Sequence, residues 1–427
     1  MYAIATYCTF CGAEYPLTQA STCSHCVRSG EESALNETLA VRYDLAPLKH
    51  RLDRDELARR PAGLWRYAEL LPVTDPAWRI DLGAGGTRLA HLTRLPESSK
   101  GHLLAMKVEG TNPTGSFKDR PIGVASCVAL ERGARGLACL TSGNIGSALA
   151  ALAAKAGAPA LVLLLGSAGQ AAQGAAVNVE KYVQISAYGA RVVTTVGDLG
   201  TLQALADRIE ARYGWSFIHN VQAFQSDGDK TTAFEICEQL GWRAPAAVFV
   251  PTGTGTNLFG IWQGFTIFKE LGFIQNLPRM FAVQPGGAAS LATAWKAKQE
   301  VPAVLDQVQP NVAPPLSHRV SGYHAYKAIR ESGGAAVAVS DQEILQAWKD
   351  LAAYEGIYCE AASAAALAGI RAALTAGLLT TDEAASQGVV GILTSSGLKN
   401  SLALSPLLDP LPQLEASEEA LLPFLTI

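Results

Sequence analysis

The sequence carries little charge of either sign. Only 17% of its 427 residues are Asp, Glu, Lys or Arg, and the formal net charge is −4, with an isoelectric point near 6.0. A chain without a basic excess has no field that attracts a polyanion, which argues against a nucleic-acid partner. Apolar residues make up 49%, enough for a large core spread over two or three domains and for contact with a second copy.

The sequence also lacks the segments typical of exported and membrane proteins. Its first residues, MYAIATYC, contain no basic region followed by a cleavable apolar core. The most apolar run, LAALAAKAGAPALVLLLG at 149–166, is interrupted by Lys155, Gly157 and Pro159. This run therefore predicts a buried helix followed by a buried strand, not a membrane span. We expect a cytoplasmic protein without a membrane partner.

The eight cysteines are unevenly placed. Four lie scattered in apolar surroundings and are predicted to be inert core thiols: Cys127, Cys139, Cys237 and Cys359. The other four form two C-x2-C pairs separated by eleven residues: Cys8, Cys11, Cys23 and Cys26. Two such pairs can supply the four thiolates of a tetrahedral zinc site, whereas disulfides are unexpected in the cytosol and a redox pair would not need duplicating. Residues 1–30 are therefore predicted to be zinc-ribbon-like.

Beyond the ribbon, short apolar strands alternate with helix-like runs and no internal repeat is present. This alternation is typical of α/β folds with parallel sheets covered by helices on both faces. The strands are predicted at 105–109, 137–141, 160–166, 191–196, 246–250, 280–285, 336–340 and 389–395. We expect a linker and N-terminal arm over 31–90 and a catalytic region over 91–410. A small domain is predicted to be inserted in that region at roughly 120–225, and 411–427 to form a C-terminal tail.

Ligands gather at the carboxyl ends of the strands in such sheets, and four loops there carry unusual residues. The first, EGTNPTGSFKDRP at 109–121, places Lys118 at the start of a predicted helix. The positive end of the helix disfavours an ammonium group. A desolvated Lys118 is thus suited to react as a free amine, which condenses with an aldehyde to form a Schiff base. The alternative is a solvated lysine paired with Asp119.

The other three loops offer complementary groups. TSGNIG at 141–146 presents the Asn144 amide to a ring hydroxyl, or serves only as a helix cap. PTGTGTN at 251–257 can place backbone N–H groups around a phosphate, although it is neither a Walker loop nor G-x-G-x-x-G. LTSSGLK at 393–399 places a hydroxyl where it can bond an unprotonated pyridine nitrogen. An aldehyde, a ring hydroxyl, a phosphate and a pyridine nitrogen together describe pyridoxal 5′-phosphate. Its predicted ligands are Lys118, Asn144, Gly253, Thr254, Gly255, Thr256, Asn257 and Thr394.

These motifs resemble those of the threonine synthases, which are fold-type II pyridoxal-phosphate enzymes like tryptophan synthase β. NPTGSFKDR, SGN, the glycine loop, CEAASAAALAG and TSSGLK carry the resemblance, which runs from about residue 60 to 400. The cysteine pairs resemble a ribbon found on some members. The resemblance implies two parallel-sheet three-layer domains, Lys118 as the Schiff-base lysine and proton shuttle, and a homodimer. It also implies an amino-acid substrate with a leaving group on its β or γ carbon, such as O-phosphohomoserine.

Two positions depart from the family at the expected substrate phosphate. The family usually has a hydroxyl residue after the Asn of its Gly-Asn loop and an arginine three residues before its Gly-Gln-Lys-Thr run. This chain has Ile145 and Gln225 there, and neither can form a charge-assisted fork with a phosphate. The predicted substrate contacts are Thr141, Ser142, Ile145, Asn220 and Gln225, with Arg120 and Lys230 as further candidate anion ligands.

These departures leave two reactions open. One is the synthesis of threonine from O-phosphohomoserine. The other is β-replacement or β-elimination resembling cysteate synthase, which joins O-phosphoserine to sulfite. A non-enzymatic alternative is a zinc-ribbon adaptor on a catalytically dead fold, but the retained Lys118, Asn144 and glycine loop argue against it.

Overall fold

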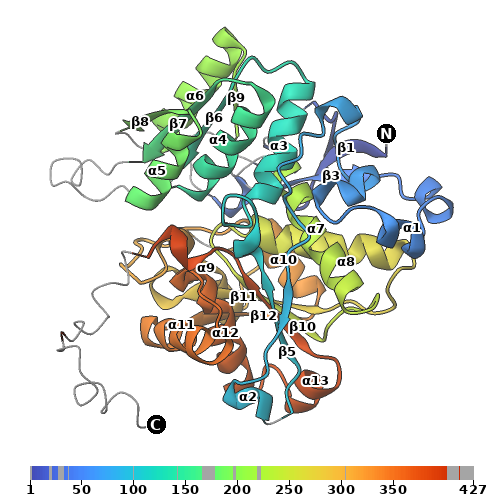
Figure 1. Ribbon diagram of the computed structural model, residues 1–427, viewed down its shortest axis with the longest axis vertical. Helices are drawn as coiled ribbons and strands as arrows, with labels where there is room; N and C mark the ends of the chain where they lie inside the picture. The colour runs from blue at the N-terminus through green and yellow to red at the C-terminus, as the bar shows by residue number, and fades with distance from the viewer. Residues whose placement is uncertain are drawn as a thin grey trace.

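The computed structural model describes residues 2–18, 22–26, 33–36, 38–99, 101–141, 143–165, 178–195, 199–218, 223–302, 304–401 and 413. Within these residues the strands form a six-stranded, a four-stranded and a three-stranded sheet. Figure 1 shows the four-stranded sheet and its helices above the six-stranded sheet and its helices. No helix of the described residues combines the length and the apolar composition needed to cross a membrane.

The large sheet has the strand order β12-β11-β10-β13-β5-β4. Its parallel strands are β5 (Leu104–Val108), β10 (Ala247–Pro251), β11 (Arg279–Pro285), β12 (Ala335–Val339) and β13 (Val389–Leu393). The edge strand β4 (Leu89–His91) runs antiparallel to β5. Most residues of the parallel strands are buried, which is typical of a sheet that has helices on both faces.

Alternate side chains of the large sheet enter two separate cores. Val248 and Val250 pack on one face with α7 (Ala223–Gln239), α8 (Thr256–Glu270) and α10 (Tyr323–Glu331). Phe249 and Phe281 stack on the other face, with ring centres 4.4 Å apart, in the core shared with α11 and α12. The remaining helices of this part are α1 (Arg54–Arg59), α2 (Pro96–Ser99), α9 (Ser290–Lys296), α11 (Asp341–Glu355), α12 (Ala361–Thr375) and α13 (Thr381–Ser386).

The small sheet is parallel throughout and has the order β8-β7-β6-β9. Its strands are β6 (Leu137–Thr141), β7 (Ala160–Leu165), β8 (Arg191–Thr195) and β9 (Ser216–Phe217). Its helices are α3 (Asp119–Glu131), α4 (Asn144–Ala156), α5 (Val179–Ala187) and α6 (Leu199–Tyr213). α4 ends at Gly157, whose φ of 67° lies in the left-handed region that favours glycine at a helix end.

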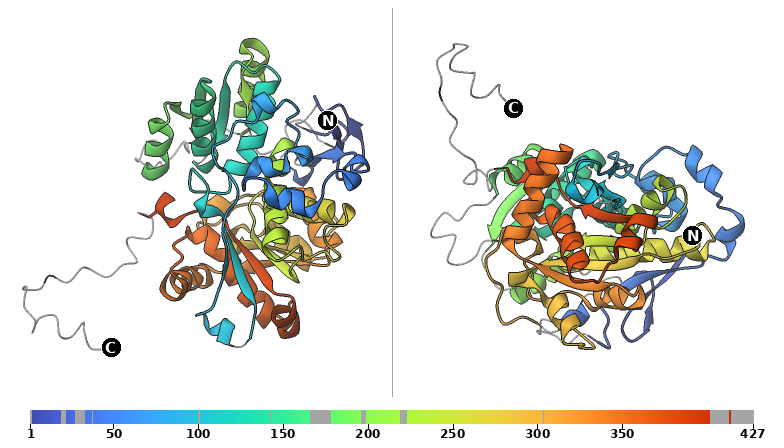
Figure 2. Two further views of the ribbon diagram at one scale, coloured as in Figure 1. Left: turned by 45° about the vertical axis from the view of Figure 1, so that its right-hand side comes forward. Right: turned by 90° about the horizontal axis from the view of Figure 1, so that it is seen from below.

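The N-terminal strands form a separate antiparallel sheet in the order β2-β1-β3. Its strands are β1 (Ala3–Cys8), β2 (Glu14–Tyr15) and β3 (Leu39–Tyr43), so this sheet continues past residue 30. Figure 2 shows it at the side of the molecule, close to both larger units. The Lys230 ammonium of α7 lies 3.8 Å from the centre of the Tyr43 ring, which joins β3 to the catalytic region.

The α/β fold predicted from the sequence is confirmed, and each of the eight predicted strands overlaps an observed one. The pattern does not predict α7, although this helix is 17 residues long. All its residues from Ala223 to Cys237, polar and apolar alike, are buried, so this part of the helix has no solvent-exposed face. A helix enclosed on all sides lacks the 3.6-residue alternation by which an amphipathic helix is recognised.

Candidate active site

Lys118 lies at the end of a tightly bonded turn that leads from β5 into α3. The 3-10 segment η5 (Glu109–Thr111) follows β5, and Lys118 is the N-cap residue of α3, with φ −60° and ψ −19°. The Asp119 carboxylate accepts hydrogen bonds from the backbone N–H and the hydroxyl of Thr114, at 2.8 and 2.7 Å. Asp119 therefore closes the turn. The half-buried Lys118 side chain places its ammonium nitrogen 4.6 Å from the centre of the Phe117 ring.

Three of the four predicted loops begin at the carboxyl ends of neighbouring strands of the large sheet. β10, β13 and β5 are adjacent and parallel, and Figure 1 shows β5 rising from the lower unit toward α3 in the upper one. The Phe117 N–H donates to the Thr394 carbonyl at 2.8 Å, and Ser116 and Ser395 form an antiparallel bridge. The Thr394 hydroxyl is buried, 2.9 Å from the hydroxyl of Ser363. The fold thus brings the Lys118 and Thr394 loops side by side.

The loop after β10 forms a glycine cup, residues 253–257, at the N-terminus of α8. Gly255 has a φ of 104°, and a Cβ there would lie 2.4 Å from the Cβ of Ala325. A Cβ on Gly253 would lie 2.7 Å from the His318 ring. Asn257 is buried, and its Nδ2 has no hydrogen-bond partner among the described residues. Backbone N–H groups at a helix N-terminus, beside an unused amide donor, suit an anion such as phosphate.

The remaining loop comes from the small sheet and reaches the large domain. Gly143 is the N-cap residue of α4, with φ 146°, and its N–H donates to the Thr141 hydroxyl at 3.0 Å. Asn144 donates from Nδ2 to a Glu360 carboxylate oxygen at 3.5 Å. Its Oδ1 is buried and accepts no hydrogen bond within the described part of the chain. Asn144 therefore spans the two domains with an acceptor left for a ligand.

The predicted substrate contacts are not all gathered at one surface. Thr141 ends β6 and is buried. Ile145 lies in the first turn of α4 with 7% of its surface exposed, within the core of the small domain. Gln225 lies in the first turn of α7 and is fully buried. Ser142 and Asn220 lie outside the described residues.

The two further candidate anion ligands, Arg120 and Lys230, form buried ion pairs within the protein instead. The buried Arg120 guanidinium pairs with Glu109 at 2.6 Å and with Glu235 at 2.7 Å. Lys230 pairs with Asp227 inside α7. An incoming anion would have to displace a buried carboxylate from either cation, which costs several kcal/mol. The structure contradicts the prediction for both residues.

Two ionisable residues near Lys118 were not predicted. Burial, with a smaller contribution from the Lys118 charge, lowers the pKa of His318 to about 4, so its imidazole is neutral at pH 7. Nothing in its local sequence, SHRVSG, marks it as a site residue. Burial raises the pKa of the Asp229 carboxyl in α7 to about 8, although the Lys118 charge opposes this shift. Asp229 could have been noticed, because it replaces the glutamine of the family's Gly-Gln-Lys-Thr run.

A contact between α5 and the large domain lies beside the Asn144 loop. Lys181 of α5 pairs with Glu360 at 2.8 Å, and a Cβ on Gly143 would lie 2.5 Å from the Lys181 Cδ. Nearby, Lys399 donates to the Gln184 side chain at 2.5 Å, and burial lowers the pKa of its ammonium group to about 8. These contacts hold the small domain against the active-site edge of the large domain.

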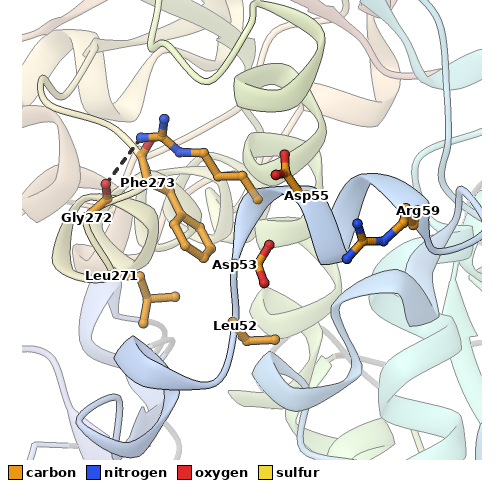
Figure 3. Close-up of a pocket in the computed structure, with 8 residues that line it drawn as sticks. Leu52, Asp53, Asp55, Arg59, Leu271, Gly272 and Phe273 are labelled. Atoms are coloured by element: carbon orange, nitrogen blue, oxygen red, sulfur yellow. Dashed lines mark hydrogen bonds between the residues drawn. The ribbon is translucent and has the colours of Figure 1, made fainter.

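A pocket of about 560 Å³ lies away from these loops, between α1 and the end of α8 (Figure 3). It is lined by Leu52, Asp53, Arg54, Asp55, Arg59, Leu271, Gly272 and Phe273. Arg54 donates to the backbone carbonyls of Gly272 and Phe273, and the Asp53 carboxylate accepts from a backbone N–H at the start of α1. These polar groups serve local structure, and no predicted site residue lines the pocket.

The four N-terminal cysteines come together at the end of β1. Their sulfur atoms lie within 4.8 Å of one another, with Cys8 and Cys26 at 3.8 Å and Cys11 and Cys23 at 3.6 Å. Sulfur atoms placed tetrahedrally about 2.3 Å from one zinc ion are about 3.8 Å apart. The cluster could therefore hold a metal ion.

Comparison with known proteins places these features in a family. The family model described as "Pyridoxal-phosphate dependent enzyme" matches residues 80–394. The chain is 36% identical over 383 residues to the threonine synthase of Methanocaldococcus jannaschii, a match that covers 89% of each protein. It is 37% identical over 397 residues to the threonine synthase of Methanosarcina acetivorans, covering 92% of this chain and 91% of that protein.

Solved structures show the same fold. The processed form of threonine deaminase isoform 2 from Solanum lycopersicum matches with a TM-score of 0.63 at 20% identity, covering 82% of this chain and 94% of that chain. Maize serine racemase matches with a TM-score of 0.62 at 20% identity, covering 75% of this chain and 91% of that one. The resemblance and the fold type predicted from the sequence are confirmed. The chain belongs to the pyridoxal-phosphate-dependent enzymes of fold type II and, within them, to the threonine synthase family.

Proposed function

We propose that this enzyme uses pyridoxal 5′-phosphate to convert O-phosphohomoserine into threonine and phosphate. The observation that carries the proposal is the convergence of the four loops, with an unused buried acceptor on Asn144 and an unused buried donor on Asn257. The relatives named threonine synthase, similar along most of this chain, support the choice of substrate.

The residues present fit the cofactor. The glycine cup would hold its phosphate, Asn144 its ring hydroxyl, Thr394 its ring nitrogen and Lys118 its aldehyde. A Cβ at Gly253 or Gly255 would collide with neighbouring side chains, so the cup keeps its backbone open to a ligand. When bound, pyridoxal phosphate supplies an electron sink for the negative charge that develops at the substrate Cα.

Lys118 is the group that would move protons on the substrate. An amine accepts a proton from carbon only when it is uncharged. The turn closed by Asp119 fixes the backbone at Lys118, and the half-buried position limits contact with water. The Thr394 side chain carries a hydroxyl group. A hydroxyl would leave the ring nitrogen of the cofactor unprotonated, whereas a carboxylate would keep it protonated.

A second candidate reaction is favoured by the chain's departures at the substrate phosphate. Ile145 and Gln225 carry no charge, and Arg120 and Lys230 are held in buried ion pairs. A shorter substrate would place its phosphate elsewhere in the site. Replacement of the phosphate of O-phosphoserine by sulfite, as in cysteate synthase, is therefore the competing reaction.

Product analysis separates the two reactions. The purified protein is incubated with O-phosphohomoserine and, separately, with O-phosphoserine and sulfite, and phosphate and amino acids are quantified. We expect equal amounts of threonine and phosphate from the first mixture. Cysteate from the second mixture without threonine from the first would favour the competing reaction.

Lys118→Ala tests whether the proposed site is catalytically active. The variant should lose turnover by a factor on the order of 10³, together with the yellow colour that pyridoxal phosphate gives when linked to a lysine. The wild-type protein, treated in parallel, is the control. A colourless wild-type protein that ignores added pyridoxal phosphate would refute the enzymatic function and favour the adaptor alternative.

We further propose that the four cysteines bind a structural zinc ion. The ribbon reaches α10 of the catalytic region, because the Phe10 and Tyr323 rings meet edge to face at 4.8 Å and Lys327 donates to the Thr9 carbonyl at 3.0 Å. Zinc should therefore co-purify and raise the melting temperature. Metal analysis of wild type and Cys23→Ser checks this. A wild-type protein without zinc, and with a melting temperature that a chelator leaves unchanged, would contradict it.

We also propose that the protein is a cytoplasmic homodimer. The family resemblance and the apolar composition of 49% support a second copy as partner. Light scattering of the purified holoenzyme checks the assembly, and a monomer mass across the accessible concentration range would contradict it.

A further inference from the structure

The backbone of the glycine cup is held by the residues that lead into α10. The Ser321 hydroxyl donates to the Gly253 carbonyl at 2.6 Å, and the Gly322 N–H donates to the Thr254 carbonyl at 2.7 Å. Gly322 is the N-cap residue of α10. Two successive carbonyl groups of the cup therefore bond two successive residues at the start of this helix, and a shift of the helix start displaces both.

These two bonds also set the direction of the N–H groups of the cup. The peptide bonds of the cup are trans, and in a trans peptide the C=O and the following N–H lie in one plane and point in opposite directions. Carbonyl groups of Gly253 and Thr254 that point toward α10 therefore turn the N–H groups of Thr254 and Gly255 away from it. The start of α10 thus orients the backbone donors on which an anion in the cup would depend.

Another side of α10 contacts the ribbon. Tyr323 and Lys327 are four residues apart and so lie on one face of the helix. The Tyr323 ring meets the Phe10 ring edge to face at 4.8 Å, and the Lys327 ammonium donates to the Thr9 carbonyl at 3.0 Å. Thr9 and Phe10 are the two residues enclosed by the first C-x2-C pair. The turn between two candidate metal ligands therefore touches the helix that orients the cup.

A metal ion bound by the four cysteines would fix this turn at both ends, because each flanking sulfur would lie about 2.3 Å from the same ion. Without a metal the turn keeps hydrogen bonds of its own. The Thr9 N–H donates to the Thr38 carbonyl at 2.8 Å, and the Gly12 N–H donates to the Cys8 carbonyl at 2.9 Å. We therefore expect loss of the metal to loosen the contact with α10 and to leave the catalytic region folded.

We propose that the four-cysteine cluster is a regulatory metal site, whose occupancy sets the affinity of the glycine cup for the cofactor phosphate. The inference rests on the proposed function, in which the cup holds that phosphate and the cysteines bind zinc. Zinc fixes the ribbon turn, the turn fixes the start of α10, and the start of α10 orients the N–H groups of the cup. Coupling between two sites is reciprocal, so bound phosphate strengthens zinc binding by the same factor.

The choice of ligand separates this coupling from a general stabilising effect of zinc. Pyridoxal carries the aldehyde, the ring hydroxyl and the ring nitrogen of the cofactor but lacks its phosphate. Its binding depends on the other three loops and leaves the cup unused. A ribbon that acts through the cup changes the affinity for pyridoxal phosphate alone, whereas a ribbon that stabilises the whole protein changes the affinity for both ligands.

The experiment titrates cofactor-free wild type, either loaded with zinc or stripped by a chelator, with pyridoxal phosphate and with pyridoxal. Binding is followed by absorbance at equilibrium. We expect removal of zinc to weaken the affinity for pyridoxal phosphate about tenfold, a coupling of ordinary size between two sites, and to leave the affinity for pyridoxal unchanged. Equal affinities for pyridoxal phosphate with and without zinc overturn the proposal. A similar loss for both ligands also overturns it.

Phe10→Ala and Ile4→Ala form a matched pair that tests the route through α10. Both side chains are large, apolar and exposed on the ribbon, by 44% and 53%, but Phe10 contacts the Tyr323 ring. With zinc bound, Phe10→Ala should weaken binding of pyridoxal phosphate and reduce the effect of zinc removal. Ile4→Ala should behave as wild type. If the two zinc-bound variants bind pyridoxal phosphate equally, the proposal is wrong, and this comparison holds even if the stripped protein unfolds.

The reciprocal measurement identifies which proposal fails. Zinc affinity is determined by competition with a coloured chelator, with and without saturating pyridoxal phosphate, and should rise about tenfold when the cofactor is present. Zinc and pyridoxal phosphate that bind independently overturn this inference alone. A wild-type protein that binds pyridoxal phosphate but no zinc overturns both the zinc site and this inference, and leaves the proposed reaction standing. A protein that binds no pyridoxal phosphate refutes the proposed function itself.

Discussion

Two buried polar regions meet at α3, and they differ in how fully their hydrogen bonds are satisfied. In the first, a buried ion network, Arg120 donates to Glu109 and Glu235 and Lys107 donates to Glu235 at 2.6 Å. Its two cations and two carboxylates balance. The second region is the set of side chains around Lys118, which we call the wall. In it, one atom of each of Asn144, Asn257 and Asp229 is buried without a hydrogen-bond partner among the described residues.

The difference separates a scaffold from a binding site. A buried polar network whose members are all bonded makes a rigid arrangement, whereas an unbonded buried polar atom costs free energy. Proteins keep few such atoms, and a group of them at one place calls for a ligand that completes their bonds. The ion network supports the first turn of α3, and under the proposed function the unused groups of the wall would bind the cofactor.

Breaking the ion network should have the largest effect. Arg120→Met leaves Glu109 and Glu235 buried with fewer partners, and we expect it to lower the free energy of unfolding by about 3–5 kcal/mol. Urea unfolding of the cofactor-free protein measures this change.

Arg60→Met is the control for that prediction. Arg60 forms ion pairs with Glu56 and Glu69 at 2.6 and 2.7 Å, but 23% of its side chain is exposed. Its loss should cost less than about 1 kcal/mol. Equal costs for the two variants would show that burial of the network does not govern its strength.

The ion network could not be predicted from the sequence. Arg120 bonds Glu109 eleven residues away and Glu235 at a separation of 115 residues, and no local spacing reveals the second contact. The sequence alone therefore offers Arg120 only as a candidate anion ligand. The correct interpretation depends on α7, which hydropathy does not reveal because both its faces are buried.

The convergence of loops was predictable for a general reason. Carboxyl ends of parallel strands lie at one edge of a sheet, and β10, β13 and β5 prove to be neighbours. The positions of wall residues that come from outside these loops could not be predicted from the strand order. His318 arrives from a segment without regular hydropathy, and its position depends on how that segment folds back against Gly253.

The pH dependence of stability should show a smaller effect at His318. Its pKa is about 4 in the folded protein because of burial and the Lys118 charge, against about 6.5 in an unfolded chain. The unfolded state thus takes up the proton first as the pH falls. The stabilisation is complete above about pH 6.5 and is lost progressively toward pH 4.

His318→Gln measures this contribution. Relative to the variant, cofactor-free wild type should lose about 2 kcal/mol of unfolding free energy between pH 7 and about pH 4.5. Urea unfolding at each pH gives the difference, in which titrations of other groups cancel. Parallel curves for the two proteins would mean that His318 is solvated in the folded state.

The smallest change in stability is expected at Asn257, a wall residue whose amide nitrogen already lacks a hydrogen-bond partner among the described residues. A fully bonded amide provides the comparison. Asn112 is a fully bonded amide, donating to Glu109 and accepting from the Gly85 N–H at 2.9 Å. Asn112→Ala should therefore lower the unfolding free energy by about 2 kcal/mol. Asn257→Ala removes an amide whose Nδ2 has no partner among the described residues, so its effect on the cofactor-free protein should stay within about 0.5 kcal/mol.

Pyridoxal phosphate should reverse this order. If the Asn257 amide donates to the cofactor phosphate, Asn257→Ala should weaken the binding free energy of pyridoxal phosphate by about 1.4 kcal/mol, which is a tenfold lower affinity. Equilibrium titration of the cofactor-free protein measures this affinity. Asn112→Ala, once folded, should bind with nearly wild-type affinity because its amide faces the scaffold. A stability loss at Asn257 as large as at Asn112, with unchanged affinity, would place Asn257 in the scaffold, and the contrast between the two regions would not hold at the glycine cup.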